Sequence, residues 1–213
     1  MATRIKELNI IIAGTGGQGV VLISEILGHA AVRDGLRVRG SEVLGMAQRG
    51  GPVFSNIRLG TEVEAPMNAE GTCDILVALE PSETLRYIQY LNKTSIVVFN
   101  TRKVIPATVT LGKSGYPALD QIEAKLAKVT ANLIGLDALD LAEKAGSRQS
   151  VNVVMLGTIF GSGRVPLKIE TAKAIIRERF PGKVADINIR AFRLGLEAAR
   201  KASTSSVFGG SSI

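Results

Sequence analysis

The chain has very few residues of the types that build disulfides and metal sites. Its 213 residues include one cysteine (Cys73), one histidine (His29) and no tryptophan. A single cysteine cannot form a disulfide within the chain or supply the thiolates of an iron–sulfur cluster, and one cysteine with one histidine falls short of a zinc site. We expect Cys73 to be a core residue and His29 to be structural. The sequence supports no Cys–His or Ser–His–Asp arrangement for nucleophilic catalysis.

Aromatic residues and long apolar runs are also scarce. Aromatic residues make up only 4% of the chain, which disfavours a stacking surface for single-stranded nucleic acid. No apolar run approaches the roughly 18 residues of a membrane span, and the charged start, Met1 to Asn9, lacks a signal-peptide core. We therefore expect a cytoplasmic protein with neither a nucleic-acid nor a membrane partner. The net charge of +7, spread along the chain, suits an acidic partner protein or a polyphosphate ligand.

The remaining composition is that of one large globular domain, with 46% hydrophobic and 21% charged residues. Strand and helix patterns alternate in the first half, which indicates α/β layers. We predict strands at 8–13, 36–40, 53–59, 74–79, 95–99, 107–111 and 130–134, and helices at 18–33, 82–91, 118–129, 137–145, 151–160, 169–180 and 183–201. The predicted fold is a single three-layer α/β/α domain, Rossmann-like, with a largely parallel sheet and a helical C-terminal third.

Two features of the C-terminal third bear on packing and on the domain boundary. The segment Val151 to Phe160 is apolar almost throughout, so we expect it to be buried. Gly157 and Gly161 are spaced for close approach to another backbone. The Ser- and Gly-rich segment 203–213 is predicted to be a flexible tail, which leaves one domain over residues 1–202.

A glycine-rich turn follows the first predicted strand. An apolar run that begins at Ile10 ends in Gly14-Thr15-Gly16-Gly17-Gln18-Gly19, and a helical pattern begins at Val20. Glycines allow positive φ and close approach of a ligand, and a helix N-terminus offers free N–H groups to an anion. This order predicts a βα unit that binds a nucleotide or a phosphate. A tight turn without any ligand fits the same residues.

The same glycines allow a second interpretation as a dinucleotide-binding domain. Gly14, Gly16 and Gly19 match G-x-G-x-x-G, and Glu42 lies near the position of a ribose-binding acid. An independent NAD- or FAD-dependent oxidoreductase is therefore an alternative. The chain offers no obvious substrate domain for such an enzyme.

A second motif occupies residues 40–51, and a simple dinucleotide domain does not need it. The segment contains four glycines, including Gly45, Gly50 and Gly51, together with Gln48 and Arg49. The Arg49 guanidinium can bind a carboxylate or a phosphate in two-point fashion. We interpret the segment as a binding loop that faces the first glycine turn. An exposed loop that leads into the next strand is the alternative.

The two motifs together resemble the small subunit of the 2-oxoacid:ferredoxin oxidoreductases, the gamma subunit or domain of the pyruvate enzymes. Within that family, Gly45-Met46-Ala47-Gln48-Arg49-Gly50-Gly51 is most similar to the beta subunit of indolepyruvate ferredoxin oxidoreductase. The resemblance continues in the segments Glu80 to Glu83 and Val104 to Pro106, and in Asn152 with Met155-Leu156-Gly157. It covers most of the chain and marks residues 1–202 as a gamma-type domain.

The resemblance implies a function for an assembly rather than for this chain alone. The assembly would oxidatively decarboxylate an aryl 2-oxoacid such as indolepyruvate, with coenzyme A accepting the acyl group and ferredoxin accepting the electrons. Thiamine diphosphate and [4Fe–4S] clusters would lie in the large alpha subunit, in a heterodimer or a dimer of heterodimers. A pyruvate, 2-oxoisovalerate or 2-oxoglutarate enzyme is the alternative within the family.

The expected role of this chain is to position coenzyme A, and no residue is expected to be catalytic or to bind a metal. The cofactor-binding residues that we expect are Gly14, Gly16, Gly17, Gln18 and Gly19 of the first motif and Gly45, Gln48, Arg49, Gly50 and Gly51 of the second. A non-catalytic assembly subunit, whose glycine loops only pack against a partner, remains an alternative.

Overall fold

The computed structural model describes residues 5–44, 51–104 and 115–208. Its centre is a six-stranded sheet in the order β2-β3-β1-β4-β5-β6. The strands are β1 (Leu8–Thr15), β2 (Arg37–Leu44), β3 (Pro52–Gly60), β4 (Cys73–Ala78), β5 (Leu91–Asn100) and β6 (Asn132–Leu136). The neighbouring strands β1, β4, β5 and β6 are parallel to one another. Strand β3 pairs antiparallel with both β1 and β2. The sheet is therefore mixed, with a parallel part and an antiparallel hairpin.

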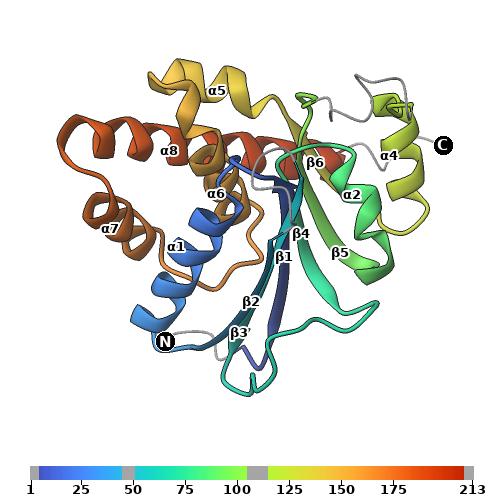
Figure 1. Cartoon of the computed structure of the whole chain (residues 1–213), viewed down its shortest axis with the longest axis horizontal. Coiled ribbons are helices and arrows are strands. Elements are labelled where there is room, and N and C mark those ends of the chain that lie inside the picture. The colour runs from blue at the N-terminus through green and yellow to red at the C-terminus, as the bar shows by residue number, and fades with distance from the viewer. Residues whose placement is uncertain (1–4, 45–50, 105–114, 209–213) are drawn as a thin grey trace.

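Helices cover both faces of the sheet (Figure 1). One face carries α1 (Val20–Arg33), α5 (Ala138–Ala145), α6 (Val151–Gly161), α7 (Ile169–Arg179) and α8 (Gly182–Phe208), and the other carries α2 (Glu83–Arg86) and α4 (Leu119–Ala127). The central strand β1 is buried along its whole length, with Ile10 and Ile12 in one core and Ile11 and Ala13 in the other. This alternation follows from the period of two in a strand. The three-layer α/β/α prediction is confirmed.

The packing of α6 against α8 confirms the predicted close approach at glycines. A Cβ atom on Gly157 would overlap the carbonyl oxygen of Phe192, and one on Gly161 would overlap that of Leu196. From the other side, a Cβ atom on Gly195 of α8 would overlap the Val154 carbonyl oxygen. Because these positions lack side chains, the two backbones are in contact. All residues of α6 from Val153 to Gly161 are buried.

Several predicted boundaries are wrong in detail. The predicted helix 82–91 is instead the short α2 followed by a 3₁₀ turn, Ile88–Tyr90, and β5 already begins at Leu91. Helix α8 continues to Phe208, so the helix extends into the predicted tail. The strand predicted at 107–111 lies outside the described residues. Within the described residues, no helix is both long enough and apolar enough to cross a bilayer.

The two scarce residue types lie where the sequence predicts. Cys73 begins β4 and is fully buried, and burial raises the pKa of its thiol to about 12. His29 lies on α1 near its C-terminal end and is exposed.

Candidate functional site

The carboxyl ends of β1 and β4 form the centre of the candidate site. These two strands are parallel neighbours, yet the helix after β1 packs on one face of the sheet and the helix after β4 packs on the other (Figure 1). In α/β sheets, ligands bind in the crevice that such a reversal opens outside the carboxyl ends. The Gly14–Gly19 loop and the Glu80–Glu83 segment flank this point.

The glycine loop needs glycine at two positions for different reasons. Gly17 and Gly19 both have positive φ, of 95° and 85°, which other residues adopt only with strain. Among the residues that the structure describes, a Cβ atom on Gly17 would have no neighbour within 4 Å, so these residues leave the space above it open. A Cβ atom on Gly19 would overlap the amide of Asn152, which reaches the loop from α6. The sequence motif therefore encodes both the turn and its close contact with α6.

Gln18 holds the loop in place through its side-chain amide. The oxygen Oε1 accepts the main-chain N–H of Thr15 at 2.7 Å, and Nε2 donates to the carbonyl of Leu79 at 3.5 Å. A Cβ atom on Gly14 would lie 2.7 Å from that Oε1, so Gly14 makes room for the amide. The structure thus gives Gln18 and Gly14 a supporting role, and direct ligand contact by either stays a prediction.

The N-terminus of α1 has no side-chain cap. Gly19 is the N-cap residue and offers no side chain, and the first intrahelical bond is donated by Ile23 to the Gly19 carbonyl at 3.2 Å. The N–H groups of the first helical turn, at Val20, Val21 and Leu22, consequently have no helical acceptor. Together with the positive end of the helix dipole, they suit an anion.

The two glycine motifs meet in the structure. The N–H of Gly16 donates to the carbonyl of Gly51 at 2.9 Å, which joins the first loop to the start of β3. Gly45, Gln48, Arg49 and Gly50 lie outside the described residues. The contact at Gly51 agrees with a second loop that faces the first, while ligand binding by these residues stays a prediction.

The segment after β4 contains a buried carboxylate that sequence reasoning did not single out as a site residue. Glu80 is fully buried, and it accepts hydrogen bonds from the Ser82 N–H at 2.9 Å and from the hydroxyls of Ser82 and Tyr116. Burial and the bond to Glu80 raise the pKa of Tyr116. The ring of Tyr116 lies 5.3 Å from the Lys103 ammonium. The hydrogen bond to Glu80 therefore holds the Tyr116 side chain at the carboxyl end of β4.

Asn100, at the end of β5, is the second residue that sequence reasoning missed. Its Nδ2 donates to the Leu79 carbonyl at 3.3 Å, and its Oδ1 accepts the N–H of Ala138 at 3.1 Å and of Arg102 at 3.2 Å. The carbonyl of Leu79 is thus shared with the amide of Gln18. A lone polar residue that ends a buried apolar strand is the signal that could have identified it.

Glu42 does not lie where a dinucleotide domain would place its ribose-binding acid. In such a domain the second strand is a parallel neighbour of the first. Here β2 is an edge strand, antiparallel to β3, and β3 separates it from β1. Glu42 instead faces Ser24 on α1, 3.4 Å from its hydroxyl. This topology removes the main support for the dinucleotide alternative.

Comparison with known proteins agrees with this geometry. The model of the pyruvate ferredoxin/flavodoxin oxidoreductase family matches residues 9–198. The chain is 46% identical over 193 residues to the indolepyruvate oxidoreductase subunit IorB of Archaeoglobus fulgidus, covering 91% of this chain and 96% of that protein.

Solved structures share the fold at low sequence identity. The gamma subunit of a keto/oxoacid ferredoxin oxidoreductase from Geobacter sulfurreducens PCA is 22% identical with a TM-score of 0.71, covering 93% of this chain and 99% of that chain. The 2-oxoglutarate:ferredoxin oxidoreductase from Magnetococcus marinus, solved with 2-oxoglutarate, coenzyme A and succinyl-CoA, is 19% identical with a TM-score of 0.72. That match covers 92% of this chain and 32% of that one. The chain belongs to the pyruvate ferredoxin/flavodoxin oxidoreductase family and is a small subunit of the 2-oxoacid ferredoxin oxidoreductase type.

Proposed function

We propose that this chain is the small subunit of an indolepyruvate-type enzyme, which oxidatively decarboxylates an aryl 2-oxoacid to an acyl-coenzyme A. Coenzyme A accepts the acyl group and ferredoxin accepts the electrons. The observation that carries this proposal is the 46% identity to an indolepyruvate oxidoreductase subunit along nearly the full length of both chains. The substrate side chain is selected by the assembled enzyme.

The redox chemistry is assigned to a large partner subunit. Thiamine diphosphate supplies the decarboxylation chemistry when bound, and [4Fe–4S] clusters need several thiolates. This chain has one cysteine, and that thiol is fully buried in the core. The donor set of this chain therefore fits neither cluster binding nor activity on its own.

The chain's own contribution is to bind and orient coenzyme A. Uncapped N–H groups at the start of α1 fit one anionic phosphate group, and none of the described residues fills the space over Gly17. Gln48 and Arg49 are assigned a second anionic group, either on the same ligand or on the partner subunit. Orientation of a reactant can supply several kcal/mol of the barrier reduction without any catalytic residue.

The test is an activity assay on the complex co-purified anaerobically with its large subunit. We expect indolepyruvate-dependent reduction of ferredoxin that requires coenzyme A, with lower kcat/KM for pyruvate, 2-oxoisovalerate and 2-oxoglutarate. The isolated small chain should show no turnover. A higher kcat/KM for pyruvate, 2-oxoisovalerate or 2-oxoglutarate would contradict the indolepyruvate assignment and place the chain in another branch of the family.

Two competing functions make different predictions in the same experiment. An independent NAD- or FAD-dependent enzyme would be recovered without a large subunit and with a bound dinucleotide. A purely structural assembly subunit would support the full reaction, yet the affinity for coenzyme A would not respond to changes in either glycine loop. Either result would overturn the proposed role of this chain.

A further inference from the structure

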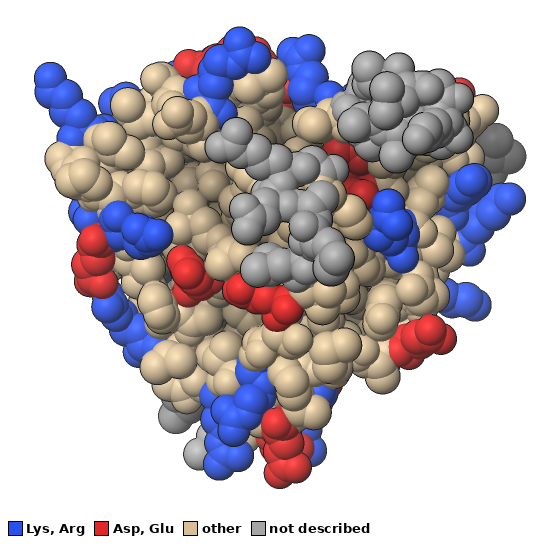
Figure 2. Space-filling view, in the orientation of Figure 1, with Lys and Arg blue, Asp and Glu red and all other residues tan. Residues whose placement is uncertain are grey.

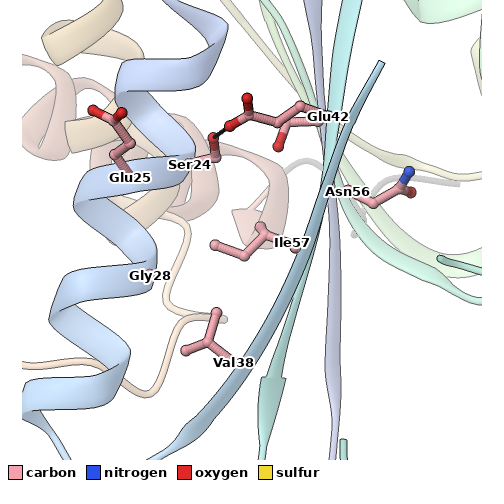
Figure 3. Close-up of a pocket in the computed structure, with 9 residues that line it drawn as sticks. Ser24, Glu25, Gly28, Val38, Glu42, Asn56 and Ile57 are labelled. Carbon is pink, nitrogen blue, oxygen red and sulfur yellow. Dashed lines mark hydrogen bonds between the residues drawn. The ribbon is translucent and has the colours of Figure 1, made fainter. Parts of the chain in front are cut away.

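A second cavity lies between α1 and the β2–β3 hairpin, and the proposed function does not use it. Its volume is about 380 Å³, and no residue of the glycine loop lines it. The lining consists of Ser24, Glu25 and Gly28 from α1, Val38, Gly40 and Glu42 from β2, and Ser55, Asn56 and Ile57 from β3 (Figure 3). We call this the hairpin cavity.

The strand register brings an acid and a hydroxyl together inside the hairpin cavity. Glu42 and Ser55 are direct cross-strand partners, so both side chains lie on the face of the sheet that α1 covers. Ser55 is only 1% exposed, and its hydroxyl has no hydrogen-bond partner among the residues that the structure describes. A hydroxyl that no side chain or carbonyl satisfies needs a ligand or water to complete its hydrogen bonds. The Ser55 hydroxyl is therefore available to a polar ligand or to water in this cavity.

Glu42 supplies the charge of the hairpin cavity. Figure 3 shows its carboxylate reaching from β2 toward Ser24 on α1, with Oε1 at 3.4 Å from the hydroxyl. The Ser24 hydroxyl also donates to the Val21 carbonyl, at the shorter distance of 2.9 Å. When its proton is used there, the Ser24 oxygen can itself accept a hydrogen bond. Within the described ranges, neither Glu42 nor Glu25 at the rim takes part in an ion pair. Figure 2 shows acidic side chains on this face over α1 and β2, in a chain of net charge +7.

The remaining walls are apolar or lack side chains. Val38 and Ile57 point toward α1 across the hairpin cavity, whereas Asn56 points away from it (Figure 3). Gly28 on the helix and Gly40 on the strand line the cavity without a side chain. A bare metal ion does not fit this site, since the described residues contain no group of three or more metal-binding side chains. The cavity instead suits a cation on an apolar stem.

We propose that the hairpin cavity binds a guanidinium group on an alkyl stem. A planar guanidinium offers five donors, enough to bind the Glu42 carboxylate at two points and to reach the free oxygens of Ser24 and Ser55. The stem packs between Val38 and Ile57. The guanidinium comes either from an arginine side chain of the partner subunit or from a free small molecule.

The experiment titrates agmatine into the isotope-labelled full-length chain at constant ionic strength and follows amide NMR signals. Butylurea serves as the neutral probe of similar shape. Three variants change the site without disturbing the fold: Glu42→Gln removes the charge, Ser55→Ala removes the hydroxyl, and Gly28→Ala narrows the space. The added Cβ of Gly28→Ala lies 3.7 Å from Ile57 and Val38, an ordinary contact. The matched control is Glu62→Gln, an exposed carboxylate paired with Lys6 elsewhere.

We expect agmatine to shift the signals of Glu42 and Ser55 while butylurea does not. Glu42→Gln should weaken agmatine binding about tenfold and Ser55→Ala about threefold. Gly28→Ala should also weaken it, and Glu62→Gln should leave it unchanged. The proposal is overturned if these signals do not move at saturating agmatine, if butylurea binds equally well, or if Glu42→Gln behaves like the control.

Repeating the titration on the complex with the large subunit identifies the source of the guanidinium. If agmatine binds the free chain but not the complex, the cavity is assigned to an arginine of the partner subunit. Glu42→Gln should then also weaken assembly. Equal binding by both assigns it to a free small molecule. This proposal does not rest on the oxidoreductase reaction, because the free chain tests it even if no complex forms.

Discussion

Helix α1 separates two polar regions that are built in opposite ways. At its N-terminus, the side chains of the crevice are satisfied within the protein. Gln18 and Asn100 both donate to the Leu79 carbonyl, and Glu80 accepts bonds from Ser82 and Tyr116. The groups left without a helical acceptor there are the main-chain N–H groups at the start of α1. Beside its second turn, in the hairpin cavity, the side chains of Glu42 and Ser55 themselves have no strong partner among the described residues.

The difference indicates which ligand charge each region takes. Satisfied side chains around free N–H groups make a rigid site for an anion. A carboxylate whose one hydrogen bond among the described residues is the long contact with Ser24, beside hydroxyl oxygens that can still accept bonds, makes a site for a cation. One helix can therefore contact a phosphate at its positive end and a guanidinium on its flank. Mutations should separate the regions, because crevice side chains support the fold and hairpin-cavity side chains do not.

The largest effect on stability should come from Glu80→Ala in the crevice. The loss of a buried acceptor leaves the Ser82 and Tyr116 hydroxyls unsatisfied, which should cost about 3 kcal/mol of unfolding free energy. Urea denaturation measures this value. Tyr116→Phe, which removes one donor and keeps the acid, should cost about 1 kcal/mol. A loss below 1 kcal/mol for Glu80→Ala would contradict the supporting role of this side chain.

Alkaline pH should destabilise the fold through a group that belongs to neither region. Burial raises the pKa of Cys73 from 9.0 to about 12, so the folded chain binds more protons than the unfolded chain between these values. Stability is complete below pH 9 and should fall by at most about 1.4 kcal/mol per pH unit above it. In Cys73→Val the fall should be shallower, with Tyr87 (pKa raised to about 12) still contributing. An identical slope in the variant would contradict this assignment.

Gln18→Ala should have a smaller effect, of about 1.5 kcal/mol, because the N–H of Thr15 loses its acceptor. The loop should also lose its order, which hydrogen exchange at Gly16 and Gly17 can measure as faster exchange. Gln149→Ala, an exposed glutamine on the surface, is the matched control and should leave both quantities unchanged. Unaltered exchange in Gln18→Ala would mean that the loop does not depend on this amide.

The smallest effect on stability should come from the hairpin cavity. Glu42→Gln and Ser55→Ala should each change the unfolding free energy by less than about 0.5 kcal/mol, because neither side chain has a strong internal partner to lose. Thermal denaturation of the two variants beside Glu80→Ala measures the contrast directly. A large loss in either hairpin-cavity variant would remove the distinction between the two regions.

Much of the fold was predictable from local pattern. The apolar run before Gly14 and the glycines after it specify β1, the turn and α1, because their constraints lie within a short segment. The antiparallel hairpin was not predicted, since nothing in residues 36–40 or 53–59 encodes their pairing partners. The helix predicted at 82–91 was also wrong, because pairing with β4 draws Leu91 into β5.

Only the local geometry of the candidate site was predictable from the sequence, for the same reason. Motif spacing was enough to single out the glycines of the Gly14–Gly19 loop and Gly51. In the structure, the hydrogen bond between Gly16 and Gly51 joins the two motifs. Glu80 and Asn100 act through partners distant in sequence, Tyr116 and Ala138, so periodicity could not assign their roles. The spacing of Glu42 from the glycines suggested a ribose-binding acid. The strand order rules this out, because β3 lies between β1 and the strand that contains Glu42.

The most direct test of the account compares Gly17→Ala with Gly35→Ala in the assembled enzyme. Both glycines have positive φ, lie at opposite ends of α1, and would place a Cβ atom more than 4 Å from every described neighbour. Both variants should therefore carry the same strain of about 1 kcal/mol. Our account predicts that Gly17→Ala raises the KM for coenzyme A about tenfold while Gly35→Ala leaves it unchanged. Equal KM values in the two variants would contradict coenzyme A binding at the glycine loop.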